Sequence, residues 1–244
     1  MFLKKADTDA GFLPFFESLL WKNRKLHYKQ KNRHKTGNVR HILKRESMEW
    51  CDNLIRIFID QGHNPERVNA GAEGNGLREQ DITYMVGYYL ANILLADGRF
   101  QVRTSRTYPE QILGYDNISS LNTRVTAANS WPADYFISIH VNANENPAIN
   151  GSEVYVYEIG SQSYYLGQDI LAEIVRRVGT MYNGVRANPS LYVLRNTNMP
   201  SVLVELAYIT NYEDAMKLRD DQYQFAYGIY VGLLNYLGLP QVLF

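Results

Sequence analysis

The sequence contains a single cysteine, Cys51, and no apolar stretch approaches the roughly 18 residues that a membrane-spanning helix requires. One cysteine cannot form a disulfide within the chain or supply a cysteine-based zinc finger. The chain also contains no His-Glu-x-x-His and no Gly-x-Ser-x-Gly motif, and Gly71, Gly74 and Gly76 do not fit a phosphate-binding loop. These absences argue against metalloproteases of the His-Glu-x-x-His type, serine hydrolases with a nucleophile elbow, and nucleotide-binding enzymes.

Formal net charge is zero, but it is distributed unevenly along the 244 residues. Residues 1–49 hold 12 Lys and Arg against five Asp and Glu, whereas residues 50–244 hold 13 against 20. The sequence therefore predicts a basic N-terminal extension, flexible or helical, followed by one acidic domain over residues 50–244. Met48, just before the first predicted strand, is an alternative start. Because nucleic-acid binding needs clustered Lys and Arg, we expect no nucleic-acid partner for the acidic domain.

From Leu54 onward, short apolar or β-branched runs alternate with segments whose apolar residues recur every three or four positions. The first pattern indicates strands and the second helices. Strands are predicted at 55–59, 100–103, 135–139, 153–157, 191–194 and 202–204, and helices at 79–97, 119–129, 164–180, 212–219 and 222–236. Such alternation predicts an α/β fold, with a twisted, mostly parallel (mixed) sheet of about six strands flanked by helices on both faces.

Only two histidines follow residue 49, and each stands directly past an apolar strand. His63 ends Ile-Asp-Gln-Gly-His and His140 ends Ile-Ser-Ile-His, while Glu79 opens the first long helix. In α/β sheets ligands bind beyond the carboxyl ends of strands. Two histidines and one carboxylate are a zinc set that leaves a fourth position open for water, although other divalent ions are not excluded. The alternative for each histidine is a structural residue capped by hydrogen bonds.

A further carboxylate, Glu205, ends the apolar run that begins at Val202. A buried carboxylate is costly unless it is paired, ligated or chemically used. Beside a metal-activated water it would accept a proton and pass it to a leaving amine. The alternative is a carboxylate paired in a salt bridge at the end of the sheet.

Several further segments stand in a recognisable order: Gly74-Asn-Gly-Leu-Arg-Glu79, Arg103-Thr-Ser-Arg106, Arg124 to Asn129, Ala133 to Ala143, Gly151-Ser-Glu-Val154 and Pro200 to Asn211. With the segment that ends at His63, they make residues 54–237 resemble the zinc-dependent N-acetylmuramoyl-L-alanine amidases of the amidase-3 type, which are bacterial and phage cell-wall hydrolases. The resemblance implies one Zn²⁺ per chain, bound by His63, Glu79 and His140, with Glu205 as the catalytic carboxylate. The substrate it implies is the amide between the muramic acid lactyl group and the first L-alanine of the peptidoglycan stem peptide.

The chain departs from that family in two places. Asn64-Pro65 follows His63 where a second glycine is usual, and Ala207-Tyr208 replaces a usual Gly-Phe. The first departure puts the shape of the loop beside the metal in doubt. Two rival interpretations remain: a carboxypeptidase-like site in which Glu66 replaces Glu79 as ligand, and a wall-binding module without turnover.

The resemblance also predicts where the protein acts and with what. We expect a monomer that acts on bacterial peptidoglycan at the cell wall, without a transmembrane segment. Lys4 and Lys5 come first as in a secretory signal, but acidic residues follow and no small-residue cleavage site appears. The export route is therefore left open, and phage-type release is one candidate.

Overall fold

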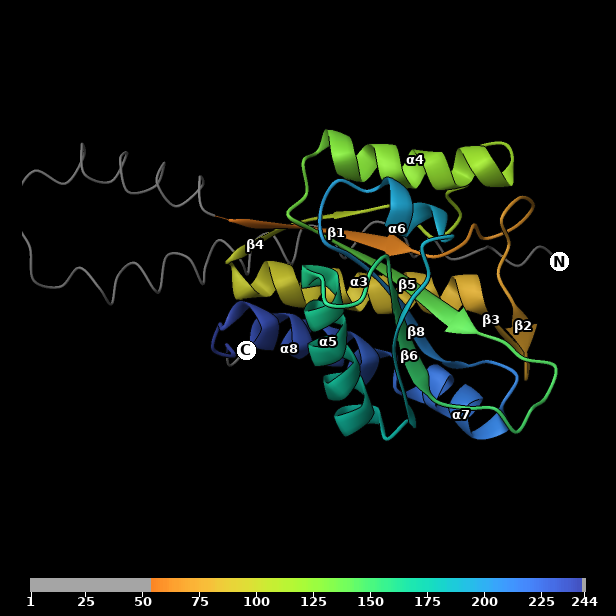
Figure 1. Ribbon diagram of the computed structural model, residues 1–244. Coiled ribbons are helices and arrows are strands. Elements are labelled where there is room, and N and C mark those ends of the chain that lie inside the picture. The colour runs from red at the N-terminus through yellow and green to blue at the C-terminus, as the bar shows by residue number, and fades with distance from the viewer. Residues whose placement is uncertain (1–53, 243–244) are drawn as a thin grey trace, which may run out of the picture. The chain divides into compact units, whose positions relative to one another are not determined.

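The computed structural model describes residues 54–242, which form an α/β domain with a central six-stranded sheet (Figure 1). The basic extension predicted over residues 1–49 lies outside the described residues. Strand order is β4-β1-β5-β8-β6-β7, and every neighbouring pair is parallel except β6 with β8. The strands are β1 (Ile55–Gln61), β4 (Phe100–Thr104), β5 (Tyr135–Asn142), β6 (Ser152–Val156), β7 (Tyr182–Ala187) and β8 (Ser201–Tyr208). The prediction of a mostly parallel, mixed sheet is confirmed.

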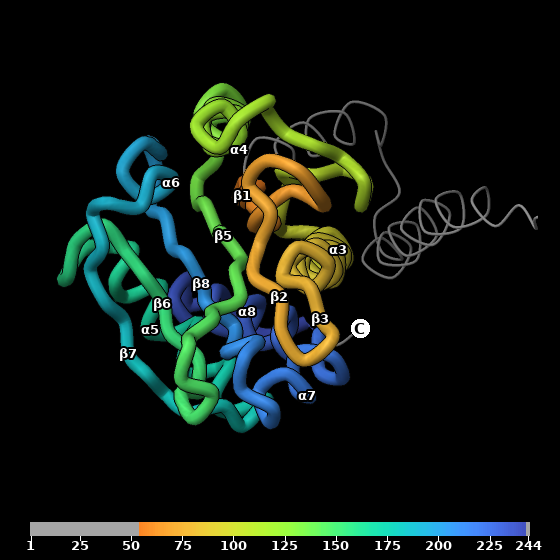
Figure 2. Tube along the Cα trace, turned by 90° about the vertical axis from the view of Figure 1, so that its right-hand side faces the viewer, coloured from red at the N-terminus to blue at the C-terminus, as the bar shows by residue number. Residues whose placement is uncertain are grey.

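Helices cover both faces of this sheet, as predicted (Figure 2). One face carries α3 (Glu79–Asp97), α5 (Gln162–Val178) and α8 (Gln222–Leu237); α3 and α5 pack against strands of the sheet, and α8 packs against both of these helices. The other face carries α4 (Asn117–Ser130) and the short α6 (Tyr192–Asn196). A helix of nine residues, α7 (Tyr212–Asp220), follows β8. A small hairpin of β2 (Glu73–Gly74) and β3 (Leu77–Arg78) precedes α3.

Alternating residues of β1 serve the two sides of the sheet, because successive side chains of a strand point to opposite faces. Ile57 and Ile59 are fully buried in the large core beneath α3, α5 and α8. Phe58 belongs to the smaller core beneath α4 and α6, where its ring stacks on Phe136 of β5 with centroids 5.7 Å apart. Asp60 lies two residues beyond Phe58 and points to the same side, so the α4 face becomes polar toward the carboxyl end of β1.

The predicted strand at 191–194 is wrong, because Tyr192–Asn196 forms the helix α6. Its Val193 and Leu194 are buried in the smaller core. An apolar run of four residues does not distinguish a strand from one helical turn. The sixth strand is instead β7, which the sequence did not reveal because its residues are half-buried or exposed and few are apolar.

Most other predicted elements are present with boundaries displaced by a few residues. The helix expected from Ser119 begins at Asn117, and its cap is Asp116, whose carboxylate accepts from the Ser119 backbone N–H while the Ser119 side chain bonds back to the Asp116 backbone. Such reciprocal capping fixes the start of α4 close to the carboxyl end of β1. Among residues 54–242, no helix is both long enough and apolar enough to cross a bilayer.

Candidate metal centre

His63, Glu79 and His140 come together at the carboxyl end of the sheet, where one ligand atom from each lies within 4.8 Å of the other two. Nε2 of His63 and Nδ1 of His140 are each 3.1 Å from Oε1 of Glu79. The two imidazole rings meet edge to face with their centroids 4.8 Å apart. The three residues come from the loop after β1, the first turn of α3 and β5, and β1 and β5 are hydrogen-bonded neighbours. The convergence expected from the sequence is therefore present.

The Glu79 carboxylate is held in one orientation by two backbone N–H groups. Oε1 accepts from Val141 and Oε2 accepts from Ala72, both at 2.9 Å. A Cβ atom at Gly71 would lie 2.8 Å from Oε2, so only glycine lets the loop approach this carboxylate so closely. Burial would raise the pKa of Glu79, but hydrogen bonds from His140 and His63 outweigh it and hold the pKa below its ordinary value. Glu79 is thus an oriented, ionised carboxylate.

The ring nitrogens of the two histidines have distinct tasks. Nδ1 of His63 lies 3.2 Å from the Asn69 carbonyl oxygen, and it can bond that acceptor only as a donor. In that tautomer Nε2, which lies 3.1 Å from Oε1 of Glu79, carries the lone pair that a metal ion at this position would accept. His140 presents Nδ1 to Glu79, and its ring lies against Gly62, where a Cβ atom would come within 2.7 Å of Cε1. The Asn69 carbonyl therefore fixes the tautomer of His63, and Gly62 leaves room for the ring of His140.

The loop after β1 contains three residues in the left-handed region of backbone conformation, His63, Arg67 and Asn69. Such a conformation costs a non-glycine residue about 1–3 kcal/mol and persists only where surrounding contacts impose it. Asn64, which replaces a glycine usual in the resembling family, supplies some of those contacts. Its side chain donates to the carbonyls of Val68 and Leu113 and accepts from the Leu113 N–H. The departure from the family pattern thus ties the loop to the segment before α4.

Glu205 stands on β8 in register with His140 of β5, and on its other side it is paired with Glu153 of β6. Residues directly opposite in neighbouring strands direct their side chains to the same face of a sheet. Among the residues that the structure describes, Oε2 of Glu205 is buried and has no hydrogen-bond partner. Burial, followed by the charges of Glu79 and Glu153, raises the pKa of Glu205 well above its ordinary value. The alternative interpretation, a salt bridge that would make Glu205 structural, is not supported, because no ion pair of Glu205 is found within residues 54–242.

Glu153 is paired with Glu205 across β6 and β8, and no role beside the candidate site was predicted for it from the sequence. Its Oε1 atom accepts from the amide of Asn142 and from the hydroxyls of Tyr155 and Tyr208. Burial together with the Glu153 charge raises the pKa of both tyrosines to about 12. Arg186 of β7 lies 3.4 Å from Oε2. Glu153 therefore belongs to a saturated polar network, in contrast to the unpartnered Glu205.

The donor set and its surroundings suit a zinc ion. Two imidazole nitrogens and one carboxylate oxygen are the borderline ligands that Zn²⁺ accepts, and three protein ligands leave a position for water or substrate. Within residues 54–242, Oε2 of Glu205 is buried without a hydrogen-bond partner, which is what a position beside a bound ion or water would leave. Glu66, the rival third ligand, has a side chain that is 65% exposed and faces Arg67. It is not part of the cluster, so the carboxypeptidase-like alternative loses its support.

Residues 57–235 match the family described as N-acetylmuramoyl-L-alanine amidase (Amidase_3). The chain is 37% identical over 185 residues to N-acetylmuramoyl-L-alanine amidase LytC of Bacillus subtilis, covering 74% of this chain and 35% of LytC. It is 34% identical over 171 residues to N-acetylmuramoyl-L-alanine amidase CwlM of Bacillus licheniformis, covering 70% of this chain and 63% of CwlM. Against these two relatives the chain thus spans between about a third and about two thirds of their length.

A crystal structure of N-acetylmuramoyl-L-alanine amidase from Clostridium difficile 630 superposes on the described fold with a TM-score of 0.68 at 32% identity, covering 76% of this chain and 98% of that one. The sheet and its flanking helices have the α/β fold of an amidase domain. The chain belongs to the Amidase_3 family of N-acetylmuramoyl-L-alanine amidases.

Proposed function

We propose that this chain is a zinc-dependent peptidoglycan amidase that hydrolyses the amide between the lactyl group of N-acetylmuramic acid and L-alanine of the stem peptide. Family membership supports the bond to be cleaved. The observation that carries the proposal is the convergence of His63, Glu79 and His140 beside the unpartnered carboxylate of Glu205. All four groups belong to one chain, so a monomer suffices, and residues 50–244 are assigned as the catalytic domain.

In this proposal His63, Glu79 and His140 would hold one zinc ion. When bound, zinc would polarise the scissile carbonyl and bring the pKa of a coordinated water toward about 7. The protein keeps the three ligand atoms in place before the substrate arrives, because backbone N–H groups orient Glu79 and the Asn69 carbonyl orients His63. Such preorganisation lowers the cost of assembling the site.

Glu205 is assigned as the group that moves the proton. It accepts a proton from the attacking water as the oxygen–carbon bond forms, and it then protonates the amine as the carbon–nitrogen bond breaks. The products are the free lactyl carboxylate and a stem peptide with an amino-terminal L-alanine. Burial supports this role because it raises the pKa of Glu205, and a carboxylate with a raised pKa retains a proton between the two steps more readily.

Mass spectrometry of purified peptidoglycan, digested with and without a metal chelator, tests this function. We expect soluble stem peptides with a free amino-terminal L-alanine in the untreated digest, none after chelation, and recovery when zinc is added back. Release of shortened stem peptides would indicate a carboxypeptidase instead. Binding to the wall without release of any peptide would indicate a binding module, and either result would contradict the proposed amidase.

A further inference from the structure

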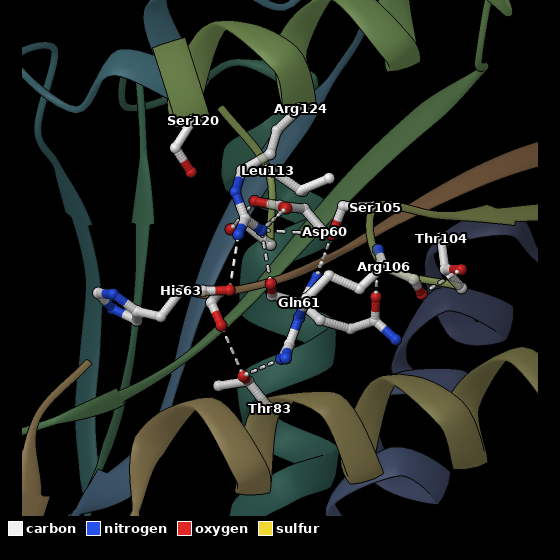
Figure 3. Close-up of polar contacts among 12 residues, drawn as sticks. Asp60, Gln61, His63, Thr83, Thr104, Ser105, Arg106, Leu113, Ser120 and Arg124 are labelled. Atoms are coloured by element: carbon white, nitrogen blue, oxygen red, sulfur yellow. Dashed lines mark hydrogen bonds and ion pairs between the residues drawn. The ribbon is translucent and has the colours of Figure 1, made fainter. Parts of the chain in front are cut away.

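The turn that carries His63 presents three successive backbone carbonyls, those of Gln61, Gly62 and His63, and each accepts a hydrogen bond from a side chain of a flanking helix. Arg124 of α4 donates from Nη1 to the Gln61 carbonyl and from Nη2 to the His63 carbonyl, both at 2.6 Å. Thr83 of α3 donates from Oγ1 to the Gly62 carbonyl at 2.7 Å. Figure 3 shows Arg124 and Thr83 approaching the turn from opposite sides.

The Arg124 guanidinium is almost fully buried, and its charge is balanced by a partner outside the turn. Nη1 lies 2.6 Å from Oδ1 of Asp60, and the side chains of both residues are 1% exposed. The other carboxylate oxygen of Asp60 accepts from the Ser138 hydroxyl on β5. Since Asp60 already compensates the charge, the two bonds to the carbonyls of Gln61 and His63 use the planar, forked geometry of arginine rather than its charge alone.

His63 needs such restraint because its backbone is left-handed, with φ at 66°. A left-handed residue reverses the path of the chain, and this reversal brings Nδ1 of His63 within 3.2 Å of the Asn69 carbonyl. If the His63 carbonyl were released, the residue could relax toward an extended backbone, and the ring would leave the position in which Nε2 faces Glu79. The orientation of this ligand thus depends on contacts made by its own backbone.

We infer that Arg124 is a positioning residue for the metal centre, and that together with Thr83 it holds the turn at residues 61–63 so that His63 is directed at the zinc position. This inference rests on the proposed function, because it assumes that His63 is a zinc ligand. The contact of Arg124 with His63 is made to the backbone carbonyl. Arg124 therefore acts through the backbone of His63.

The test compares Arg124→Lys and Arg124→Met with the wild-type chain, and Arg56→Lys is the matched control. Arg56 also forms an ion pair with an aspartate, Asp134. This pair lies at the opposite end of β1, and the side chains of both residues are partly exposed. For each protein the zinc dissociation constant is measured by competition with a chromophoric chelator, at a temperature where thermal unfolding of the metal-free form has not begun. The unfolding temperature of the metal-free form is recorded separately.

We expect Arg124→Lys to weaken zinc binding by about 10- to 100-fold, the range typical of lost support around a metal ligand. Lysine keeps the charge beside Asp60, so this variant should unfold at a higher temperature than Arg124→Met while binding zinc no better. Arg56→Lys should bind zinc like the wild type. Should both Arg124 variants fail to fold, Thr83→Val removes the bond to the Gly62 carbonyl from the other helix and should also weaken zinc binding.

The inference would be overturned if a folded Arg124→Lys variant bound zinc as tightly as the wild type. If only Thr83→Val folds, the same result in that variant would overturn it. So would a loss of affinity in Arg56→Lys equal to that in Arg124→Lys. A wild-type chain that binds no zinc, or that binds it and releases no stem peptide, would instead contradict the proposed function. The two failures are therefore distinguishable.

Discussion

Replacement of Gly62 by alanine places one methyl group against the ring of His140, and its effect can be worked out from the structure. The added Cβ would lie 2.6 Å from the Ile139 carbonyl oxygen, 2.7 Å from Cε1 of His140 and 2.8 Å from its Nε2. Ordinary contacts of these kinds begin near 3.4 Å, so the ring or the strand must shift by more than half an ångström. Gly62 is not left-handed, and the effect of the substitution is therefore purely steric.

Overpacking of this kind typically costs about 1–3 kcal/mol of folding stability. Movement of the His140 ring relieves two of the three contacts, whereas the contact with the Ile139 carbonyl, which accepts from the Gly62 N–H, requires the backbone to shift as well. We therefore expect the ring to move, and zinc affinity to fall by about tenfold or more, as for other displaced metal ligands. Peptidoglycan hydrolysis at limiting zinc should fall in parallel and recover in part when zinc is in excess.

Competition with a chromophoric chelator measures the zinc affinity, and thermal unfolding of the metal-free protein measures the cost to the fold. Gly160→Ala is the control, because alanine there strains a backbone with φ at 79° while its Cβ would meet nothing within 4 Å. It should lose stability without losing zinc. If Gly62→Ala binds zinc as tightly as the wild type, the ring of His140 is not where the structure places it relative to the metal, and the reasoning fails.

Three further outcomes are expected. Glu205→Gln should retain zinc and lower turnover by about 10²- to 10⁴-fold, as measured by stem-peptide release, since the amide cannot transfer the proton; near-normal turnover would refute its assigned role. Glu79→Ala should abolish tight zinc binding in a chelator competition while Glu66→Ala leaves it unchanged, and the reverse result would restore the carboxypeptidase-like site. Burial opposes ionisation of Asp60, but Arg124 holds the pKa of Asp60 below its ordinary value. The Asp60–Arg124 pair therefore contributes its full stabilisation above the pKa of an unfolded-state aspartate, which is about 4. This contribution is lost as pH falls through the lower pKa of Asp60 in the folded protein. Unfolding temperatures recorded from pH 7 down to pH 3 should therefore fall more steeply for the wild type than for Asp60→Asn, and parallel curves would show that the pair does not couple to pH.

The cluster of His63, Glu79 and His140 could be predicted from the sequence because histidine is scarce in residues 50–244 and each of the two histidines there follows an apolar strand. Parallel strands place their carboxyl ends at one edge of a sheet, so the loop after β1 and the end of β5 had to lie near each other. Glu79 was found for a similar reason, since it opens the helix that follows the glycine-rich loop. Local pattern and general topology together were sufficient for these residues.

The environment of Glu153 could not be predicted in the same way. Tyr155 lies two residues away on the same strand, but Asn142, Arg186 and Tyr208 come from three other strands, and only the observed strand order and register bring these three to Glu153. The strand that carries Arg186 was itself missed, because an edge strand with half-exposed side chains leaves little hydrophobic signal. Contacts made by arginine and glutamate across a sheet depend on tertiary geometry that a single sequence does not encode locally.

The reversed direction of β6 has a consequence for how this domain can vary. Because β6 is antiparallel to β8, the segment at 143–151 leaves β5 and enters β6 at the same edge of the sheet as the histidines. That crossing is a surface connection between two strand ends, and surface connections tolerate insertion and deletion far better than the strands they join. Lengthening or shortening it would reshape the edge of the sheet beside the histidine–carboxylate cluster, while the strands that carry His140 and Glu205 stay unchanged. Under the proposed function, substrate selectivity could therefore change through this connection without any change in the residues assigned to hydrolysis.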